Sequence, residues 1–111
     1  MAIKIVISDT VGIKVKGNIN DAAGVPQPFD FNLTCARLDA DQIQHKLKSE
    51  SEASITDFLV DVIDGWSGVR DADEKPLPYN EENLLQLCKI PGVANLAFRT
   101  YLAEVGAKEK N

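Results

Sequence analysis

The sequence contains few of the residues from which catalytic and metal sites are usually built. Its 111 residues include one histidine and two cysteines, and aromatic residues make up only 6%. Two cysteines cannot form a disulfide framework or a four-cysteine zinc site, so we expect Cys35 and Cys88 to be small buried apolar residues. No apolar run reaches the roughly 20 residues of a membrane span, and the charges in Met1–Asp9 do not fit a signal peptide. These absences predict a cytosolic protein.

Basic residues are also in short supply. Twelve Lys and Arg against seventeen Asp and Glu give a formal net charge of −5, which argues against binding to nucleic acid or anionic lipid. The glycines Gly12, Gly17 and Gly24 lack the following lysine and hydroxyl residue of a phosphate-binding loop. With 44% hydrophobic and 26% charged residues, the composition is that of a soluble globular domain.

Apolar residues alternate with polar ones in the first third of the chain, which predicts β-strands. Residues 2–7 and 11–16 both show this period of two, and the short polar Ser8–Thr10 between them predicts a hairpin turn. Residues 17–28 are rich in glycine, proline, asparagine and aspartate and are expected to form a loop. The alternation returns in 29–35, which predicts a third strand.

After Leu38 the apolar spacing changes to three and four residues, which predicts helices. The expected N-terminal residues of four helices are, in chain order, Asp39, Ser54, Asn80 and Gly92. The second helix has the widest apolar stripe, which runs from Ile55 to Trp66. The last is expected to end at Gly106.

Together these patterns predict one α+β domain over residues 1–111. A small N-terminal antiparallel sheet of about three strands is followed by about four helices that pack against it, because each strand has an apolar face that needs cover. Residues 1–37 form the β-rich part, 38–106 the helical part, and 107–111 a flexible charged tail.

The acidic stretch that begins at Asp71 partly matches a calcium-binding loop. Asp71, Asp73 and Glu82 occupy the first, third and twelfth positions of the EF-hand spacing. The fifth position, which should be a ligand, is Lys75, and Pro76 stands where the turn requires glycine. We therefore expect no calcium site.

His45 lies between Gln44 and Lys46 on the short first helix, and we expect it on a solvated helix surface. No catalytic constellation accompanies it in the sequence, so we expect no enzyme activity, no cofactor and no bound metal. The alternative from a different functional class is a small metal-dependent hydrolase that uses Asp71, Asp73 and His45.

The single tryptophan, Trp66, has two alternative roles. It can close the core between a helix and the following loop, or it can form an apolar partner-binding patch with Val69, Leu77 and Tyr79. Unpaired edges of the predicted sheet are a second possible partner surface.

The second half of the chain resembles the tail assembly chaperones of long-tailed phages and prophages. The similarity lies in the order and spacing of several short motifs: Gly65-Trp66-Ser67-Gly68-Val69, Pro76-Leu77-Pro78-Tyr79, Glu82-Asn83-Leu84, Ile90-Pro91-Gly92-Val93, Tyr101-Leu102 and Lys108-Glu109-Lys110-Asn111. One departure is Asp73-Glu74-Lys75, where the family often has a glycine.

The resemblance implies a non-enzymatic protein that works in the cytoplasm of a bacterial host. Such a chaperone binds the long helical tape-measure protein, keeps it soluble, and leaves as tail-tube subunits polymerise around it, so it is absent from the mature virion. The tail-tube protein is another partner that the resemblance allows. The exposed strand edges and the helical stripe of the predicted fold also permit self-assembly into a homo-oligomer. The alternative within this class is a structural tail component that is retained in the virion.

Overall fold

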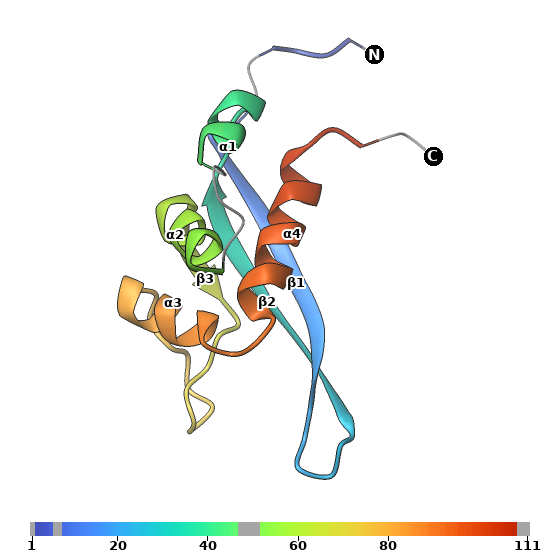
Figure 1. Ribbon diagram of the computed structural model, residues 1–111, viewed down its shortest axis with the longest axis vertical. Coiled ribbons are helices and arrows are strands. Elements are labelled where there is room, and N and C mark those ends of the chain that lie inside the picture. Colours follow the sequence, from blue (N-terminus) through green and yellow to red (C-terminus); the bar gives the residue numbers. More distant parts are fainter. Residues whose placement is uncertain (1, 6–7, 47–51, 109–111) are drawn as a thin grey trace.

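The computed structural model describes residues 2–5, 8–46 and 52–108, which form a sheet and helices in the order β1–β2–α1–α2–β3–α3–α4 (Figure 1). The strands are β1 (Thr10–Asn20), β2 (Pro26–Ala36) and β3 (Ile63–Ser67). The helices are α1 (Ala40–Lys46), α2 (Glu52–Val62), α3 (Glu81–Cys88) and α4 (Val93–Val105). The strands form one antiparallel sheet in the order β1-β2-β3, so the predicted α+β class is confirmed.

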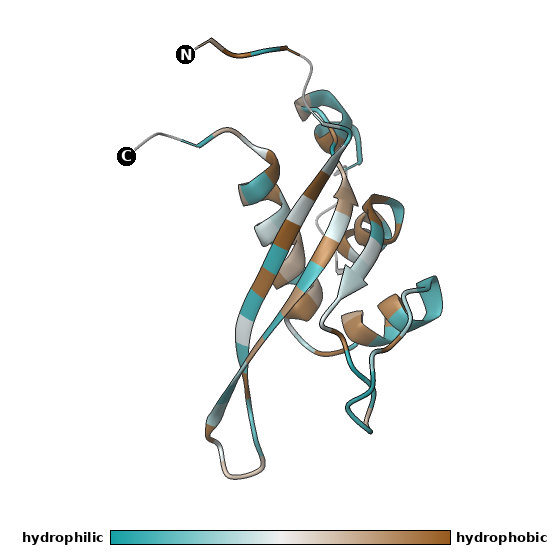
Figure 2. Ribbon diagram, turned by 180° about the vertical axis from the view of Figure 1, so that it is seen from behind, coloured by the Kyte–Doolittle hydropathy of each residue, from teal (hydrophilic) through white to brown (hydrophobic). Residues whose placement is uncertain are grey.

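The core lies between one face of this sheet and the helices α2 and α4, while the opposite face is open (Figures 1 and 2). Apolar residues of β1 and β2 are paired across the two strands, Ile13 with Leu33 for example, and their side chains are buried. Helix α4 packs on β1, and α2 packs on α4. The buried residues are Val11, Ile13, Val15, Phe31, Leu33, Cys35, Phe58, Leu59, Val62, Ile63, Leu84, Val93, Ala97 and Tyr101. None of the helices in the described ranges is long and apolar enough to cross a membrane.

The β1–β2 hairpin is longer than expected, because the predicted loop over residues 17–28 shrinks to a tight turn. The Asp21 amide donates to the Val25 carbonyl, and the Asp21 carboxylate accepts from the amides of Ala23 and Val25. These hydrogen bonds lower the pKa of Asp21. Gly24 completes the turn at φ 80°, a conformation that residues with a Cβ adopt only under strain. A five-residue connection therefore suffices, and the strands continue on both sides of it.

Gly17 belongs to β1 and not to a loop, and its missing side chain has a packing role. A Cβ at this position would lie 2.7 Å from Phe29 Cζ and 2.9 Å from Leu96 Cδ2. The glycine therefore lets the ring of its cross-strand partner Phe29 and the Leu96 side chain of α4 lie over β1.

The strand predicted over residues 2–7 is wrong for the part that the structure describes. Ala2–Ile5 is not in a strand, and the side chains of Ile3 and Ile5 are 83% and 98% exposed; Val6 and Ile7 lie outside the described residues. Tight hairpin turns need residues at positive φ, usually glycine or asparagine, and Ser8–Thr10 has neither. Instead the Arg37 amide donates to the Asp9 carbonyl, so pairing with β2 already begins there.

The third strand is β3, which lies inside the segment 38–106 that was predicted to be helical. The apolar stripe was predicted to continue to Trp66, but α2 ends at Val62. The residues that follow pair with β2, Ile63 with Cys35 and Trp66 with Leu33. Gly65 disfavours the helix, and the free edge of β2 offers backbone hydrogen bonds that a longer α2 could not use.

Three of the predicted helix starts are confirmed, because Gly92 directly precedes α4, which also ends before Gly106 as expected, and the starts at Asp39 and Asn80 have capping hydrogen bonds. The Asp39 carboxylate accepts from the Gln42 amide at 2.8 Å while Gln42 Oε1 accepts from the Asp39 amide, a reciprocal capping box. Asn80 Oδ1 accepts from the Asn83 amide at the start of α3. The predicted start at Ser54 is wrong, because α2 already begins at Glu52.

Helix α4 is fixed to the end of β2 by two polar side chains. The fully buried Tyr101 hydroxyl donates to the Ala36 carbonyl at 2.8 Å and accepts from the Leu38 amide at 3.1 Å. Arg37 Nη1 donates to the Val105 carbonyl at 3.0 Å, which places a cation at the negative end of the helix dipole. These contacts hold α4 over the sheet.

Removing the Tyr101 hydroxyl should therefore destabilise the protein. In Tyr101→Phe the Leu38 amide and the Ala36 carbonyl lose a buried partner, so we expect the free energy of unfolding to fall by about 1–3 kcal/mol in urea denaturation.

Burial raises the pKa of Tyr101, so the folded state keeps the hydroxyl proton at a pH at which the unfolded chain loses it. Stability should therefore fall as pH rises above about 10, and less steeply in the variant. An unchanged unfolding midpoint in Tyr101→Phe would contradict this role.

Candidate functional site

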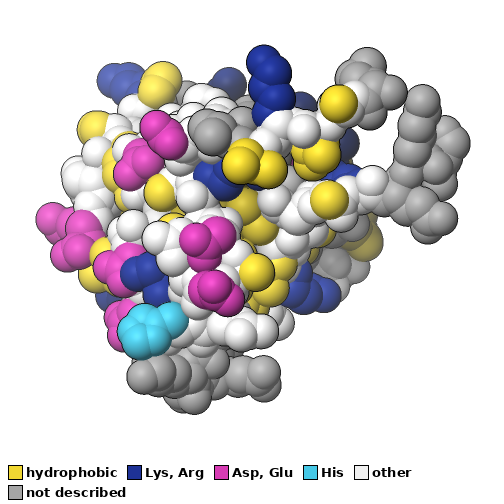
Figure 3. Space-filling model, turned by 90° about the horizontal axis from the view of Figure 1, so that it is seen from above, with side chains coloured by type: hydrophobic (Ala, Val, Ile, Leu, Met, Phe, Trp, Pro, Cys, Tyr) yellow, Lys and Arg dark blue, Asp and Glu magenta, His cyan; other side chains and the backbone are white. Residues whose placement is uncertain are grey.

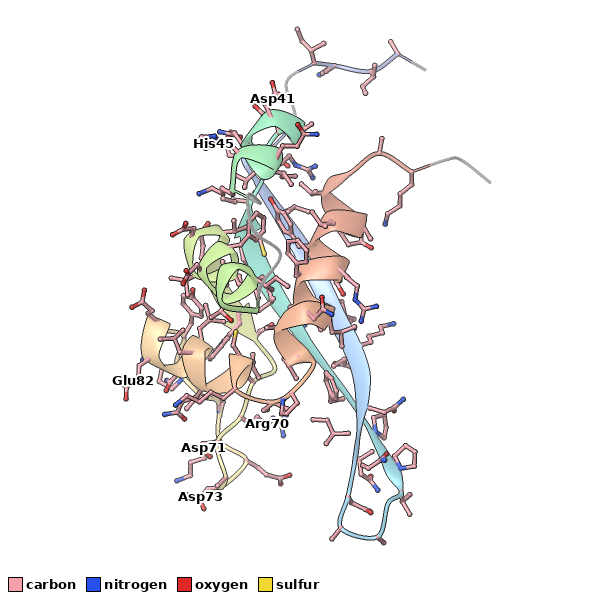
Figure 4. The ribbon with its side chains drawn as sticks, in the orientation of Figure 1. Asp41, His45, Arg70, Asp71, Asp73 and Glu82 are labelled. Carbon is pink, nitrogen blue, oxygen red and sulfur yellow. The ribbon has the colours of Figure 1, made fainter. Side chains whose placement is uncertain are left out.

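The acidic residues that partly match a calcium loop are used to build a turn. Asp71 Oδ1 accepts from the amides of Asp73 and Lys75, and Glu74 has a positive φ of 61°. The Asp71 amide donates to the Lys75 carbonyl, which closes the loop. Figure 4 shows Asp71 and Asp73 at the end of this loop, with Glu82 at the start of α3.

The groups of the alternative hydrolase are not brought together. His45 lies on α1, far from Asp71 and Asp73 (Figure 4), and it is exposed on the surface (Figure 3). Within the described residues, no three His, Cys, Asp or Glu side chains are close enough to share a metal ion. Burial, with a smaller effect of the nearby Asp64 carboxylate, raises the pKa of the Cys35 thiol to about 12, which keeps it protonated. Burial also raises the pKa of Cys88.

The four residues of the predicted partner patch do come together, and we call them the Trp66 cluster: Trp66, Val69, Leu77 and Tyr79. The rings of Trp66 and Tyr79 meet edge to face with centroids 5.1 Å apart. Trp66 Nε1 donates to the Leu77 carbonyl at 2.8 Å, and the Leu77 amide donates to the Val69 carbonyl at 2.9 Å. All four side chains are half-buried, so the cluster fastens the loop after β3 to the sheet while leaving part of its surface exposed.

A larger apolar hollow lies elsewhere, between α2, α4 and the turn that joins α3 to α4. We call it the α2–α4 groove; its volume is about 620 Å³. Its lining consists of Ile55, Thr56, Cys88, Lys89, Pro91, Gly92, Ala94, Asn95, Phe98 and Leu102. Ala94, Phe98 and Leu102 recur every four residues and present one row of α4 to the groove. The groove offers a hydrophobic floor with a few polar groups along it.

A second hollow of about 200 Å³ separates the hairpin from the α3–α4 turn. Its walls include Ile19 of β1 and Ile90 after α3, which are 45% and 37% exposed. Val69 belongs to this wall as well, so one member of the Trp66 cluster also borders a groove.

Sequence reasoning did not find the α2–α4 groove. Its walls come from α2 and from the last quarter of the chain, and every apolar residue in it also fits an ordinary core-facing stripe. One signal was present: α4 carries apolar residues over more of its circumference than the sheet covers, with Ala97 buried and Phe98 half-buried. Such a wide stripe indicates a second apolar contact.

Comparison with known proteins identifies the family. The sequence model of the YdaY prophage protein family matches residues 30–110, which is more than two thirds of the chain. The chain belongs to the YdaY prophage protein family. No curated protein and no solved structure showed significant similarity to this YdaY family protein. The matched region contains most of β2, all of β3, helices α1 to α4 and the residues that line the α2–α4 groove. Membership of a prophage protein family confirms the expected phage or prophage origin.

The position of Trp66 predicts a structural contribution that can be measured. Trp66→Ala removes the contact with Tyr79 and leaves the Leu77 carbonyl without its donor, so unfolding should cost about 3 kcal/mol less. Trp66→Phe keeps a ring and loses only the hydrogen bond, and should cost about 1 kcal/mol. Both values can be taken from chemical denaturation. An unchanged stability with lost partner binding would instead make Trp66 a contact residue.

Proposed function

We propose that this protein is a phage tail assembly chaperone that binds helical segments of the tape-measure protein in its α2–α4 groove. Membership of a prophage protein family and the motif similarity to tail assembly chaperones support the biological setting. The observation that carries the proposal is the groove itself, a largely apolar hollow of about 620 Å³ between α2 and α4. The proposed activity is binding alone, without a catalytic step or a cofactor.

The groove has the chemistry that an amphipathic helix requires. Apolar side chains spaced by three and four residues on the partner can enter between Ile55 on α2 and Phe98 on α4. Polar groups of Thr56, Lys89 and Asn95 lie among these apolar residues and can meet the polar flanks of the helix. A binding site that reads apolar spacing and little else suits a long partner that offers many similar segments.

The acidic character of the protein is compatible with this role. A formal net charge of −5 makes copies that line up along one long helical partner repel each other. Repulsion of this kind limits aggregation while each copy covers apolar surface, and it eases displacement when tube subunits arrive.

Co-expression with the tape-measure protein of the same prophage tests the function. We expect the tape-measure protein to be recovered in the soluble fraction in a complex with this protein, and to be largely insoluble without it. Equal solubility in both cases, with no complex on size-exclusion chromatography, would refute the proposal. Mass spectrometry of finished particles separates the alternative role, because a structural tail component would be present in many copies and a chaperone should be missing.

A charge placed in the groove tests the binding surface. Ala94 lines the groove in the first turn of α4, where an acidic residue is favourable for the helix, so Ala94→Glu should fold normally and still weaken binding to tape-measure peptides. We expect the dissociation constant to rise by about 10-fold or more in isothermal titration. The control is Ala103→Glu, the same change at an exposed position of the same helix that does not line the groove. Because an acidic residue is less favourable near the C-terminal end of a helix, circular dichroism should confirm that both variants are folded. Equal affinities of the two variants would place the partner elsewhere.

A further inference from the structure

The N-terminal segment Ala2–Ile5 has the pattern of a strand but no strand partner in the described structure. Ile3 and Ile5 alternate with Ala2 and Lys4, yet both isoleucines are more than four-fifths exposed. Leaving two large β-branched side chains in water forgoes a substantial hydrophobic gain. Within the described residues, the fold of one chain therefore offers no surface that buries Ile3 and Ile5.

Of the two edges of the sheet, the β3 edge is covered and the β1 edge is open. Beside β3, the Tyr79 hydroxyl donates to the Ile63 carbonyl and Trp66 Nε1 donates to the Leu77 carbonyl, so the Leu77–Tyr79 stretch lies along this strand. Among the described residues, backbone pairing of β1 is with β2 alone. An 11-residue strand with one unpaired side is a template for a further strand.

The hydrogen-bond register shows which residues of β1 face outward. The Arg37 amide bonds to Asp9, and Asp21 bonds to Val25, so odd-numbered residues of β1 exchange hydrogen bonds with β2. The amides and carbonyls of the even-numbered residues therefore point to the open edge: Thr10, Gly12, Lys14, Lys16 and Asn18. Their side chains lie on the polar, helix-free face of the sheet.

We propose that Ala2–Ile5 of one copy adds as an antiparallel strand to the β1 edge of a second copy. Reciprocal exchange of this segment between two copies forms a closed dimer. This self-association is separate from the α2–α4 groove and does not depend on the proposed chaperone role.

Charge and burial select one register for the added strand. Ile3 and Ile5 gain burial only on the helix-covered face, beside Ile13 and Val11 of the second copy. Lys4 then lies on the polar face, where opposition to Lys14 or Lys16 would be repulsive. Thr10, Gly12 and Asn18 carry no like charge, but only with Gly12 opposite Lys4 do both isoleucines face buried side chains, Ile3 against Ile13 and Ile5 against Val11. Gly12 also has open space beside it for the Lys4 side chain.

The segment fits a second copy better than its own chain. To return beside its own β1, the chain would need a tight turn at Ser8–Thr10, where neither glycine nor asparagine is present. The Asp9 carbonyl is also already bonded to Arg37. Pairing between two copies needs no such turn.

Light scattering across a concentration series tests the dimer. The wild-type protein should dimerise. The double variant Ile3→Asp/Ile5→Asp should raise the dissociation constant of the dimer by about 100-fold or more, while its far-ultraviolet circular dichroism spectrum stays unchanged. Val25→Asp, at a half-exposed position in the hairpin turn, should leave dimerisation unchanged. A wild-type protein that is monomeric throughout the series would overturn the proposal.

Disulfide trapping tests the edge and the register. In a Cys88→Ser background, chains carrying Lys4→Cys are mixed with chains carrying Gly12→Cys under mild oxidation, and intact mass spectrometry should find the mixed dimer. Gly65→Cys is the matched control, because Gly65 lies on the same open face in the opposite edge strand and also has room for a side chain. Equal trapping at Gly65, or a disulfide within a monomer of the Lys4→Cys/Gly12→Cys double variant and no mixed dimer, would refute the interchain pairing.

Discussion

The arrangement of the helices follows from the need to keep six apolar side chains on one face of the β1–β2 hairpin away from water. These side chains are Val11, Ile13, Val15, Phe31, Leu33 and Cys35. The hairpin turns all six to the same side because strand residues alternate between faces. Helices α2 and α4 therefore gather on that side, and Tyr101 and Arg37 fix α4 at the end of β2. The opposite face carries small and polar side chains and needs no cover.

Local patterns in the sequence predicted which side chains are buried, but they did not always predict whether the segment is a helix or a strand. The alternation over residues 11–16 and 29–35 was sufficient to predict the buried parts of β1 and β2, because a half-buried strand has a period of two that a helix does not share. Ile63 and Trp66 fit a helical stripe equally well, and only the free edge of β2 decides for a strand. Ala2–Ile5 shows the converse case, in which a clear strand pattern has no partner within the described chain.

The same distinction separates the two kinds of candidate site. The Trp66 cluster was predictable because its members lie within one short stretch of sequence, so a single loop brings them together. The α2–α4 groove was not predictable, because it depends on the angle at which Ile55 and Phe98 approach each other from distant segments. The acidic loop partly matches the spacing of a calcium loop for a different reason, because the Asp71 carboxylate accepts backbone hydrogen bonds within its own turn.

Because helices cover only one face of the sheet, the other face of β1 can carry charged side chains, and these restrict which strands can pair with its open edge. An unpaired strand edge would accept many partners, and lysines on such an edge are a common means of preventing this. Lys14 and Lys16 stand on the outward-facing positions of β1 and repel an incoming strand that carries a cation opposite them. Gly12 leaves one position without charge or bulk. Of Gly12, Lys14 and Lys16, only Gly12 can stand opposite Lys4 without like-charge repulsion. The two lysines that exclude other strands therefore also align the two copies in the proposed register.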